Sequence, residues 1–167
     1  MILGKAIKQA SEILKTNNIL SYELDAQLIL SNIMEIKREF LITNYEETVS
    51  KNTLEKYNIA IQRRVKKEPV AYITGKKEFW SVDFVVNKST LVPRPETEIL
   101  IYKLISFFKN KSINILDIGT GSGCILLSIL KELNLSIGTG IDISSKAIQT
   151  AKKNSQNLNL LNRAKFK

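Results

Sequence analysis

The sequence contains no histidine and a single cysteine among its 167 residues. Histidine is the commonest metal ligand and the commonest general base near neutral pH, so its absence argues against a metal centre and against a Ser-His catalytic pair. One cysteine excludes a disulfide within the chain. We therefore expect that the protein has no metal-binding site.

Long apolar runs are also missing. No uninterrupted run approaches the roughly 20 residues of a membrane-spanning helix, and the residues after Met1 follow an amphipathic pattern without the core or cleavage site of a signal peptide. The hydrophobic content of 44% nevertheless suffices for a packed core. These features predict one or two small cytoplasmic domains without a membrane partner.

Acidic residues are few compared with basic ones: 16 Asp and Glu stand against 25 Lys and Arg, a formal net charge of +9. Part of the positive charge is concentrated in Arg63-Arg64-Val65-Lys66-Lys67. Such a segment suits an acidic or RNA-containing partner, but lysines spread along a chain also form ordinary solvated helix faces. The sequence leaves both interpretations open.

The first 70 or so residues repeat apolar side chains at the spacing of amphipathic helices. We expect a first helix to end near Asn17. A second helix should be capped by Ser21 and carry Leu24, Leu28 and Met34 in its apolar stripe. A later helix should be capped by Thr53 and keep its cationic residues in solvent, namely Arg63, Arg64 and Lys66.

The pattern changes at Glu68-Pro69, because proline disfavours helix at the residue before it. Partial alternation over 78–86 predicts a strand, which residues 87–89 would turn back through 90–92 as a hairpin. Phe79 and Trp80 are expected to form an apolar plug between domains. A helix over 96–108 follows, and its inward-facing residues are expected to be Leu100, Leu104 and Phe107.

A short apolar segment, residues 113–118, runs into three alternating glycines in Gly119-Thr120-Gly121-Ser122-Gly123. Glycine has no Cβ, so backbone N–H groups in such a loop can approach a ligand closely. The start of the following helix at Cys124 adds unpaired donors. The loop is typical of a cradle for a nucleotide-type cofactor, and Cys124 is expected to pack rather than to act as a nucleophile.

The glycine spacing favours S-adenosyl-L-methionine over NAD. A dinucleotide loop reads G-x-G-x-x-G, whereas this loop reads G-x-G-x-G, with Asp117 two residues before its first glycine. Asp142 ends the next apolar run, where an acid can accept hydrogen bonds from ribose hydroxyls. Two alternatives stay open: a dehydrogenase, and a glycine-rich surface turn beside a solvated aspartate.

A helix over 144–157 and a third strand over 164–167 continue this pattern into a parallel α/β sheet. A doubly wound sheet has helices on both faces and neighbours on both sides of its central strand. Because the chain stops at the third strand, we expect the strand over 113–118 to keep one unpaired edge and apolar helix faces to be exposed.

Three further stretches stand in order before the glycine loop and Asp142: Glu68-Pro69-Val70-Ala71-Tyr72-Ile73-Thr74-Gly75, Glu78-Phe79-Trp80, and Leu91-Val92-Pro93-Arg94-Pro95-Glu96-Thr97-Glu98. With these stretches the chain resembles the HemK-type protein-glutamine N5-methyltransferases, which modify peptide chain release factors. The resemblance implies an α + α/β fold. It consists of a helical substrate-recognition domain over 1–72, a β-hairpin linker over 73–95, and a truncated doubly wound, Rossmann-like methyltransferase domain over 96–167.

The resemblance also implies a cytoplasmic enzyme that methylates a glutamine side chain in release factors, with S-adenosyl-L-methionine as cofactor and no nucleic acid as direct substrate. The residues expected to hold the cofactor are Gly119, Thr120, Gly121, Ser122, Gly123, Asp142 and Asp117. Arg94 and Thr97 would lie close to the cofactor, or would simply anchor a helix start.

Members of the family carry an Asn-Pro-Pro-Tyr motif that holds the glutamine amide, and this sequence contains no such motif. Catalytic residues therefore stay unassigned, and a complementing C-terminal half joins the release factors among the expected partners. One alternative is a non-catalytic binding fragment of a split or fused methyltransferase. A nucleic-acid amino-methyltransferase is another, against which the Pro-Arg-Pro-Glu-Thr-Glu block argues.

Overall fold

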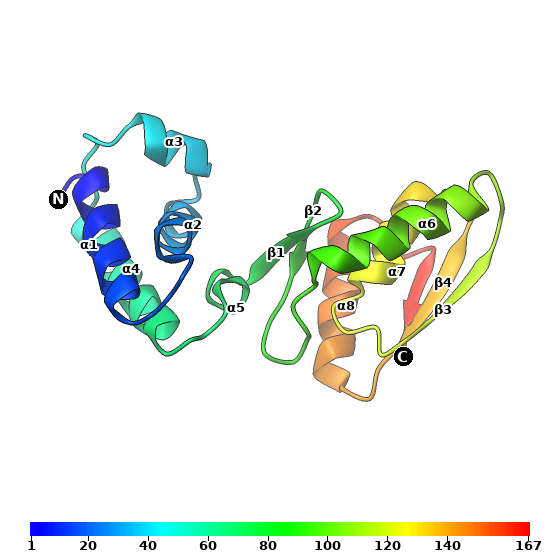
Figure 1. The fold of residues 1–167 in the computed structure, drawn as a ribbon. Helices are drawn as coiled ribbons and strands as arrows, with labels where there is room; N and C mark the ends of the chain where they lie inside the picture. The colour runs from blue at the N-terminus through cyan, green and yellow to red at the C-terminus, as the bar shows by residue number, and fades with distance from the viewer. The chain divides into compact units, whose positions relative to one another are not determined.

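The computed structural model describes residues 1–167, which divide into two compact units, Met1–Thr74 and Gly75–Lys167. Each unit has its own hydrophobic core. Figure 1 labels the helices and strands of both. None of the helices combines the length and apolar character that crossing a bilayer requires.

The first unit is a bundle of helices in which α1, α2 and α4 pack on one another. The core is closed by large buried side chains that include Leu14, Leu30 and Tyr57. The Tyr57 hydroxyl donates a hydrogen bond to the Ala26 carbonyl at 2.9 Å, and burial raises the pKa of Tyr57. The helices are α1 (Leu3–Thr16), α2 (Tyr22–Met34), α3 (Arg38–Thr43), α4 (Lys51–Val65) and α5 (Val70–Thr74).

Of two predicted helix caps, one is wrong. Ser21 is the N-cap residue of α2 as predicted, although its hydroxyl donates to Asp25 Oδ2 at 2.9 Å and accepts no backbone hydrogen bond. In α4 the cap is Ser50, whose Oγ accepts from the Thr53 amide at 3.1 Å, so Thr53 lies inside the helix. Serine and threonine are both favoured at the N-cap position, so the sequence alone did not show which side chain accepts the capping hydrogen bond.

The predicted apolar stripe of α2 is wrong at two of its three positions, since only Met34 packs against the core. Leu24 and Leu28 are 43% and 37% exposed, whereas the helix buries Ala26, Ile29 and Leu30. Apolar residues occur on more than one side of this helix, so periodicity did not identify the side that packs.

The predicted solvent position of Arg64 is wrong, since its side chain is only 17% exposed, whereas the Arg63 side chain is 42% exposed; both form ion pairs. Arg64 Nε donates to Asp25 Oδ2 at 2.7 Å. Arg63 donates two hydrogen bonds of 2.8 Å to the carboxylate of Glu68. The charges of the two arginines are therefore used inside the first unit, while Lys66 is exposed as expected.

The second unit combines a hairpin with a three-stranded parallel sheet in the order β3-β4-β5. The predicted parallel α/β pattern and the single neighbour of the first strand of this sheet are confirmed. The elements are β1 (Lys76–Phe79), β2 (Val82–Val85), a 3₁₀ turn (Pro95–Thr97), α6 (Glu98–Phe108), β3 (Asn114–Ile118), α7 (Cys124–Glu132), β4 (Ile137–Ile141), α8 (Ser145–Asn157) and β5 (Ala164–Phe166).

The hairpin turns at Trp80 and Ser81, not at the predicted residues 87–89. Both turn residues have positive φ, 52° and 53°, as two-residue hairpin turns of the favoured type require. Neither is glycine, asparagine or aspartate, so the sequence did not mark these residues as positions of positive φ. The Trp80 amide donates to Glu98 Oε1 at 2.8 Å and its indole Nε1 donates to Glu132 Oε1 at 3.0 Å, which holds the turn in this conformation.

The predicted inner face of α6 is wrong at two of three positions. Leu100 and Phe107 are 46% and 72% exposed, whereas Ile101 is fully buried and Leu104 packs against the core. This helix is apolar on nearly every side, so its sequence does not define a single buried stripe.

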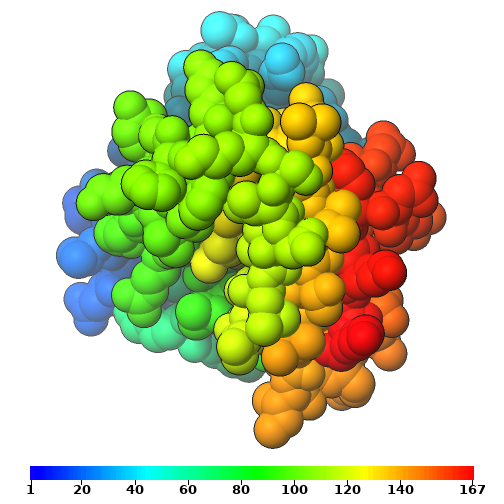
Figure 2. Space-filling model, turned by 90° about the vertical axis from the view of Figure 1, so that its right-hand side faces the viewer, coloured from blue at the N-terminus to red at the C-terminus, as the bar shows by residue number.

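Helices α7 and α8 cover one face of the sheet, and small residues allow their close approach. A Cβ on Gly138 of β4 would overlap the Leu126 side chain of α7. The opposite face leaves Leu116, Ile118 and Ile137 more than half exposed. Figure 2 shows the yellow-green segment around β3 beside the orange segment around β4 at the surface. One sheet face and one edge of β3 are thus open.

Candidate functional site

The glycine loop lies where β3 ends and α7 begins, and it is tied to the end of the neighbouring strand. The amides of Gly119 and Thr120 both donate to the Ile141 carbonyl, at 2.9 and 3.0 Å. Gly119, Gly121 and Gly123 have φ values of 74°, 56° and 77°, in the left-handed region that favours glycine. The alternating glycines are therefore required by the path of the backbone.

The three glycines differ in what surrounds them. A Cβ on Gly119 would meet nothing within 4 Å, and one on Gly121 would meet only the Gly119 carbonyl at 4.0 Å. A Cβ on Gly123 would lie 3.1 to 3.2 Å from side chains of α7, α8 and β5. The first two glycines thus border open space from which a ligand can approach the backbone closely, and the third permits close packing.

Both predicted aspartates contact the loop. Asp117 Oδ2 accepts a hydrogen bond from Thr120 Oγ1 at 2.7 Å. Asp142 follows β4 and accepts two backbone hydrogen bonds of 2.9 Å, one from the Gly121 amide and one from the Ser144 amide. The structure therefore brings Asp142 to the loop across 21 residues of sequence.

The loop's two polar side chains point away from the open space. Thr120 and Ser122 are 5% and 2% exposed, so the loop offers a ligand mainly its backbone. Arg94, also predicted near a cofactor, is exposed, and Thr97 makes no capping hydrogen bond to α6. No group of three or more acidic or cysteine side chains is arranged to hold a metal ion.

Asn154 is a site residue that the sequence reasoning missed. This residue of α8 is 1% exposed, and its side-chain amide makes three hydrogen bonds. Its Oδ1 accepts from the Val85 amide at 2.8 Å, and its Nδ2 donates to the Val85 and Ser122 carbonyls at 2.9 Å each. Asn154 therefore joins β2, the glycine loop and α8. The signal in the sequence is an asparagine at helical spacing from buried Ala147 and Ala151.

Cys124, the first residue of α7, behaves as predicted for a packing residue. Burial raises the pKa of its thiol and outweighs any lowering by the helix start. A raised pKa keeps the thiol protonated at neutral pH, so Cys124 is a poor nucleophile.

We predict that Asn154→Ala lowers the free energy of unfolding of the second unit by about 2–4 kcal/mol, because it removes the hydrogen-bond partner of the half-buried Val85 amide and carbonyl and of the buried Ser122 carbonyl. The measurement is denaturant unfolding, combined with hydrogen exchange at the Val85 amide, which should become faster. Gln156→Ala on the exposed side of α8 is the control and should change stability by less than about 0.5 kcal/mol. Equal effects of the two substitutions would refute the role of Asn154.

We further predict that Cys124 in the folded chain reacts with a thiol-specific disulfide reagent at pH 8 at least about tenfold more slowly than free cysteine. The raised pKa leaves less thiolate at this pH, and the reaction should accelerate as the pH rises. In urea the rate should return to that of free cysteine. A native rate equal to the denatured one would contradict the prediction.

Comparison with known proteins gives two family matches. Residues 5–75 match the PrmC N-terminal domain, and residues 109–167 match a methyltransferase domain. The chain is 37% identical over 98% of its length to a release factor glutamine methyltransferase of Caulobacter vibrioides, covering 57% of that protein. It is 41% identical over 99% of its length to that of Clostridium acetobutylicum, covering 59% of it.

A bifunctional methyltransferase of Rickettsia bellii is 37% identical over 79% of the chain, which covers 29% of that protein. The chain thus spans somewhat more than half the length of the two release factor glutamine methyltransferases, and its similarity to them extends over almost all of its own residues. It is therefore similar to release factor glutamine methyltransferases along almost all of its own length, with a match to the PrmC N-terminal domain followed by a match to a methyltransferase domain.

Proposed function

We propose that this chain is the cofactor-binding part of a methyltransferase that transfers a methyl group from S-adenosyl-L-methionine to the side-chain amide nitrogen of a glutamine in peptide chain release factors. The observation that carries the proposal is the loop over 119–123, in which two glycines border open space and two aspartates accept hydrogen bonds from loop residues. The names of the relatives support the choice of substrate.

The cofactor-binding residues proposed are Gly119, Thr120, Gly121, Ser122, Gly123, Asp117 and Asp142. The glycines would let the cofactor approach the backbone closely, and the unpaired amides in the first turn of α7 would donate hydrogen bonds to it. Asp142 uses one lone pair on each carboxylate oxygen for backbone amides, and a carboxylate offers about four such sites. Its remaining lone pairs are available to ribose hydroxyls. When bound, the cofactor would supply a methyl group on a positively charged sulfur.

An amide nitrogen is a poor nucleophile because its lone pair is delocalised, so rate acceleration would depend on positioning the glutamine against the methyl donor. We propose that residues 1–72 recognise the release factor, that 73–95 link the two parts, and that 96–167 bind the cofactor. We also propose the cytoplasm as the place of action, where release factors work.

A complementing C-terminal polypeptide is a further part of the proposal. The free edge of β3 presents unpaired backbone groups, and the adjacent sheet face exposes Leu116 and Ile118. Parallel sheets are normally covered on both faces. The relatives are longer than this chain, so residues equivalent to their remaining part would supply neighbours for β3 and the groups that hold the glutamine.

The first test is calorimetric titration of the chain with S-adenosyl-L-methionine. We expect saturable binding that Asp142→Asn weakens at least about tenfold, because asparagine keeps the shape of the side chain but loses one charged acceptor. Asp83→Asn, which changes an exposed acid of β2, should leave the affinity unchanged. Thermal unfolding of both variants establishes that each is folded. Absence of binding to the unsubstituted chain, or equal affinity of all three proteins, would contradict the assignment of the loop.

The second test is transfer of a radiolabelled methyl group to a purified release factor. The remaining part of the Clostridium acetobutylicum relative is joined after Lys167, and the intact relative serves as positive control. We expect label on the release factor only with the joined protein, and none on a release factor whose acceptor glutamine is replaced by asparagine. Label on added RNA instead of the release factor would favour the nucleic-acid alternative, and no label on either would refute the proposed activity.

A further inference from the structure

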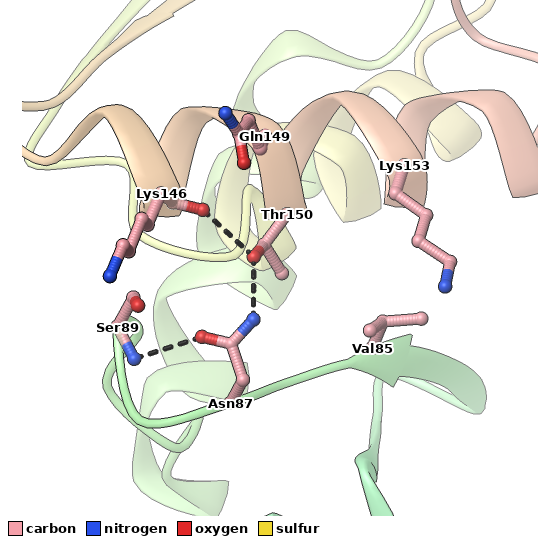
Figure 3. Close-up of a pocket in the computed structure, with 7 residues that line it drawn as sticks. All are labelled: Val85, Asn87, Ser89, Lys146, Gln149, Thr150 and Lys153. Atoms are coloured by element: carbon pink, nitrogen blue, oxygen red, sulfur yellow. Dashed lines mark hydrogen bonds between the residues drawn. The ribbon is translucent and has the colours of Figure 1, made fainter.

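A cavity of about 340 Å³ lies between α8 and the segment that follows β2. Its polar lining comes from Asn87 and Ser89 on that segment and from Lys146, Gln149 and Lys153 on α8. Figure 3 shows the two lysine side chains at either end of the cavity, with Asn87 and Thr150 between them. Neither the glycine loop nor the two aspartates of the candidate cofactor site line it.

The walls of this cavity are fixed by hydrogen bonds. Asn87 Nδ2 donates to Thr150 Oγ1 at 2.8 Å, and Asn87 Oδ1 accepts from the Ser89 amide at 2.8 Å. Thr150 in turn donates to the Lys146 carbonyl at 3.0 Å. Asn154 holds Val85 two residues before Asn87. The cavity is therefore a built feature of the second unit, and its shape does not depend on flexible side chains alone.

The lining is cationic, and its charge is not neutralised. Lys146 and Lys153 form no ion pair, and no acidic residue lines the cavity. Residues 143–167 contain six Lys and Arg and no Asp or Glu. By contrast, the arginines of the segment Arg63–Lys67 are paired with carboxylates. The segment around α8 thus carries positive charge that no ion pair and no acid of its own neutralises.

The spacing of the lysines indicates an extended ligand. Lys153 lies seven positions after Lys146, which corresponds to a rise of about 10.5 Å along a helix. A single phosphate could not easily bridge this distance, whereas a polymer with repeated negative charges can contact both ammonium groups. Lysine, with serine, asparagine and glutamine, is the set that contacts phosphate and sugar in nucleic-acid complexes. The cavity has no arginine to fork onto a carboxylate and no aromatic side chain to stack on a base.

We propose that this cavity binds the phosphate backbone of a polynucleotide without sequence preference. The contact is separate from the proposed methyl transfer, so either can fail without the other. Lys146 and Lys153 supply the two cationic contacts, and Gln149 and Ser89 donate hydrogen bonds to the oxygens between them.

The test is fluorescence anisotropy of short labelled RNA homopolymers with the full chain, over roughly 50 to 200 mM salt. We expect similar affinities for uridylate and adenylate polymers. Lys146→Gln combined with Lys153→Gln should weaken binding about tenfold at the lowest salt, and should reduce the slope of log affinity against log salt by about 1.4, the value for two lost contacts with a single strand.

The matched control is Lys152→Gln combined with Lys165→Gln, which removes the same charge from exposed positions of the same segment outside the cavity. It should weaken binding by less than about twofold. Equal losses in the two double variants would overturn the proposal in favour of diffuse charge attraction. Competition by polyglutamate as effective as competition by unlabelled RNA would overturn it in favour of an acidic protein. Absence of RNA binding at the lowest salt would also overturn it.

Discussion

The side-chain amide of Asn154 is the interaction on which the second unit depends. A buried amide is costly unless its donors and acceptors are paired, and Asn154 finds its partners in β2 and the glycine loop. The hairpin strand is therefore more than a connection, because it satisfies a group that also holds the carbonyl of Ser122. Loss of the hairpin contact would leave the amide half-paired and remove one restraint on the loop. The hydrogen bond between Asn87 and Thr150 adds a second contact between the same two segments, one turn before Asn154 on α8.

The sheet imposes a second constraint. Strand-helix-strand crossovers are right-handed, so two successive crossovers in one direction place α7 and α8 on the same face. The glycines of β4 and Gly123 let these helices approach closely, and the loop is thereby fixed at the strand ends. The cost is that Leu116 and Ile118 remain in solvent on the other face. Loop geometry and the open face thus have one origin, since both follow from how the chain winds from β3 to β5.

The sequence predicted the elements that depend on local residue types. Alternating glycines, an acid after each strand and a serine before α8 are local signals, and the strands and helices of the α/β part lie where they were expected. The failures concern contacts that are distant in sequence. The turn at Trp80 and Ser81 is held by hydrogen bonds from Trp80 to Glu98 and Glu132, and neither turn residue is of a type that favours positive φ. Arg64 and Asp25, which form an ion pair, are 39 residues apart in the sequence. The apolar residues of α6 lie on several sides of the helix and do not define one buried face.

The two basic segments of the chain demonstrate why charge counts alone mislead. In Arg63–Lys67 the arginines meet Glu68 and Asp25, and Lys67 donates to the carbonyls of Asn17 and Asn18 at the end of α1. That charge stabilises the first unit and is largely unavailable to a partner. On α8 the nearest acid in sequence is Asp142, which is engaged with the Gly121 and Ser144 amides. The lysines of α8 consequently have no internal partner. A basic run therefore becomes a binding surface only where the fold withholds the carboxylates that would neutralise it.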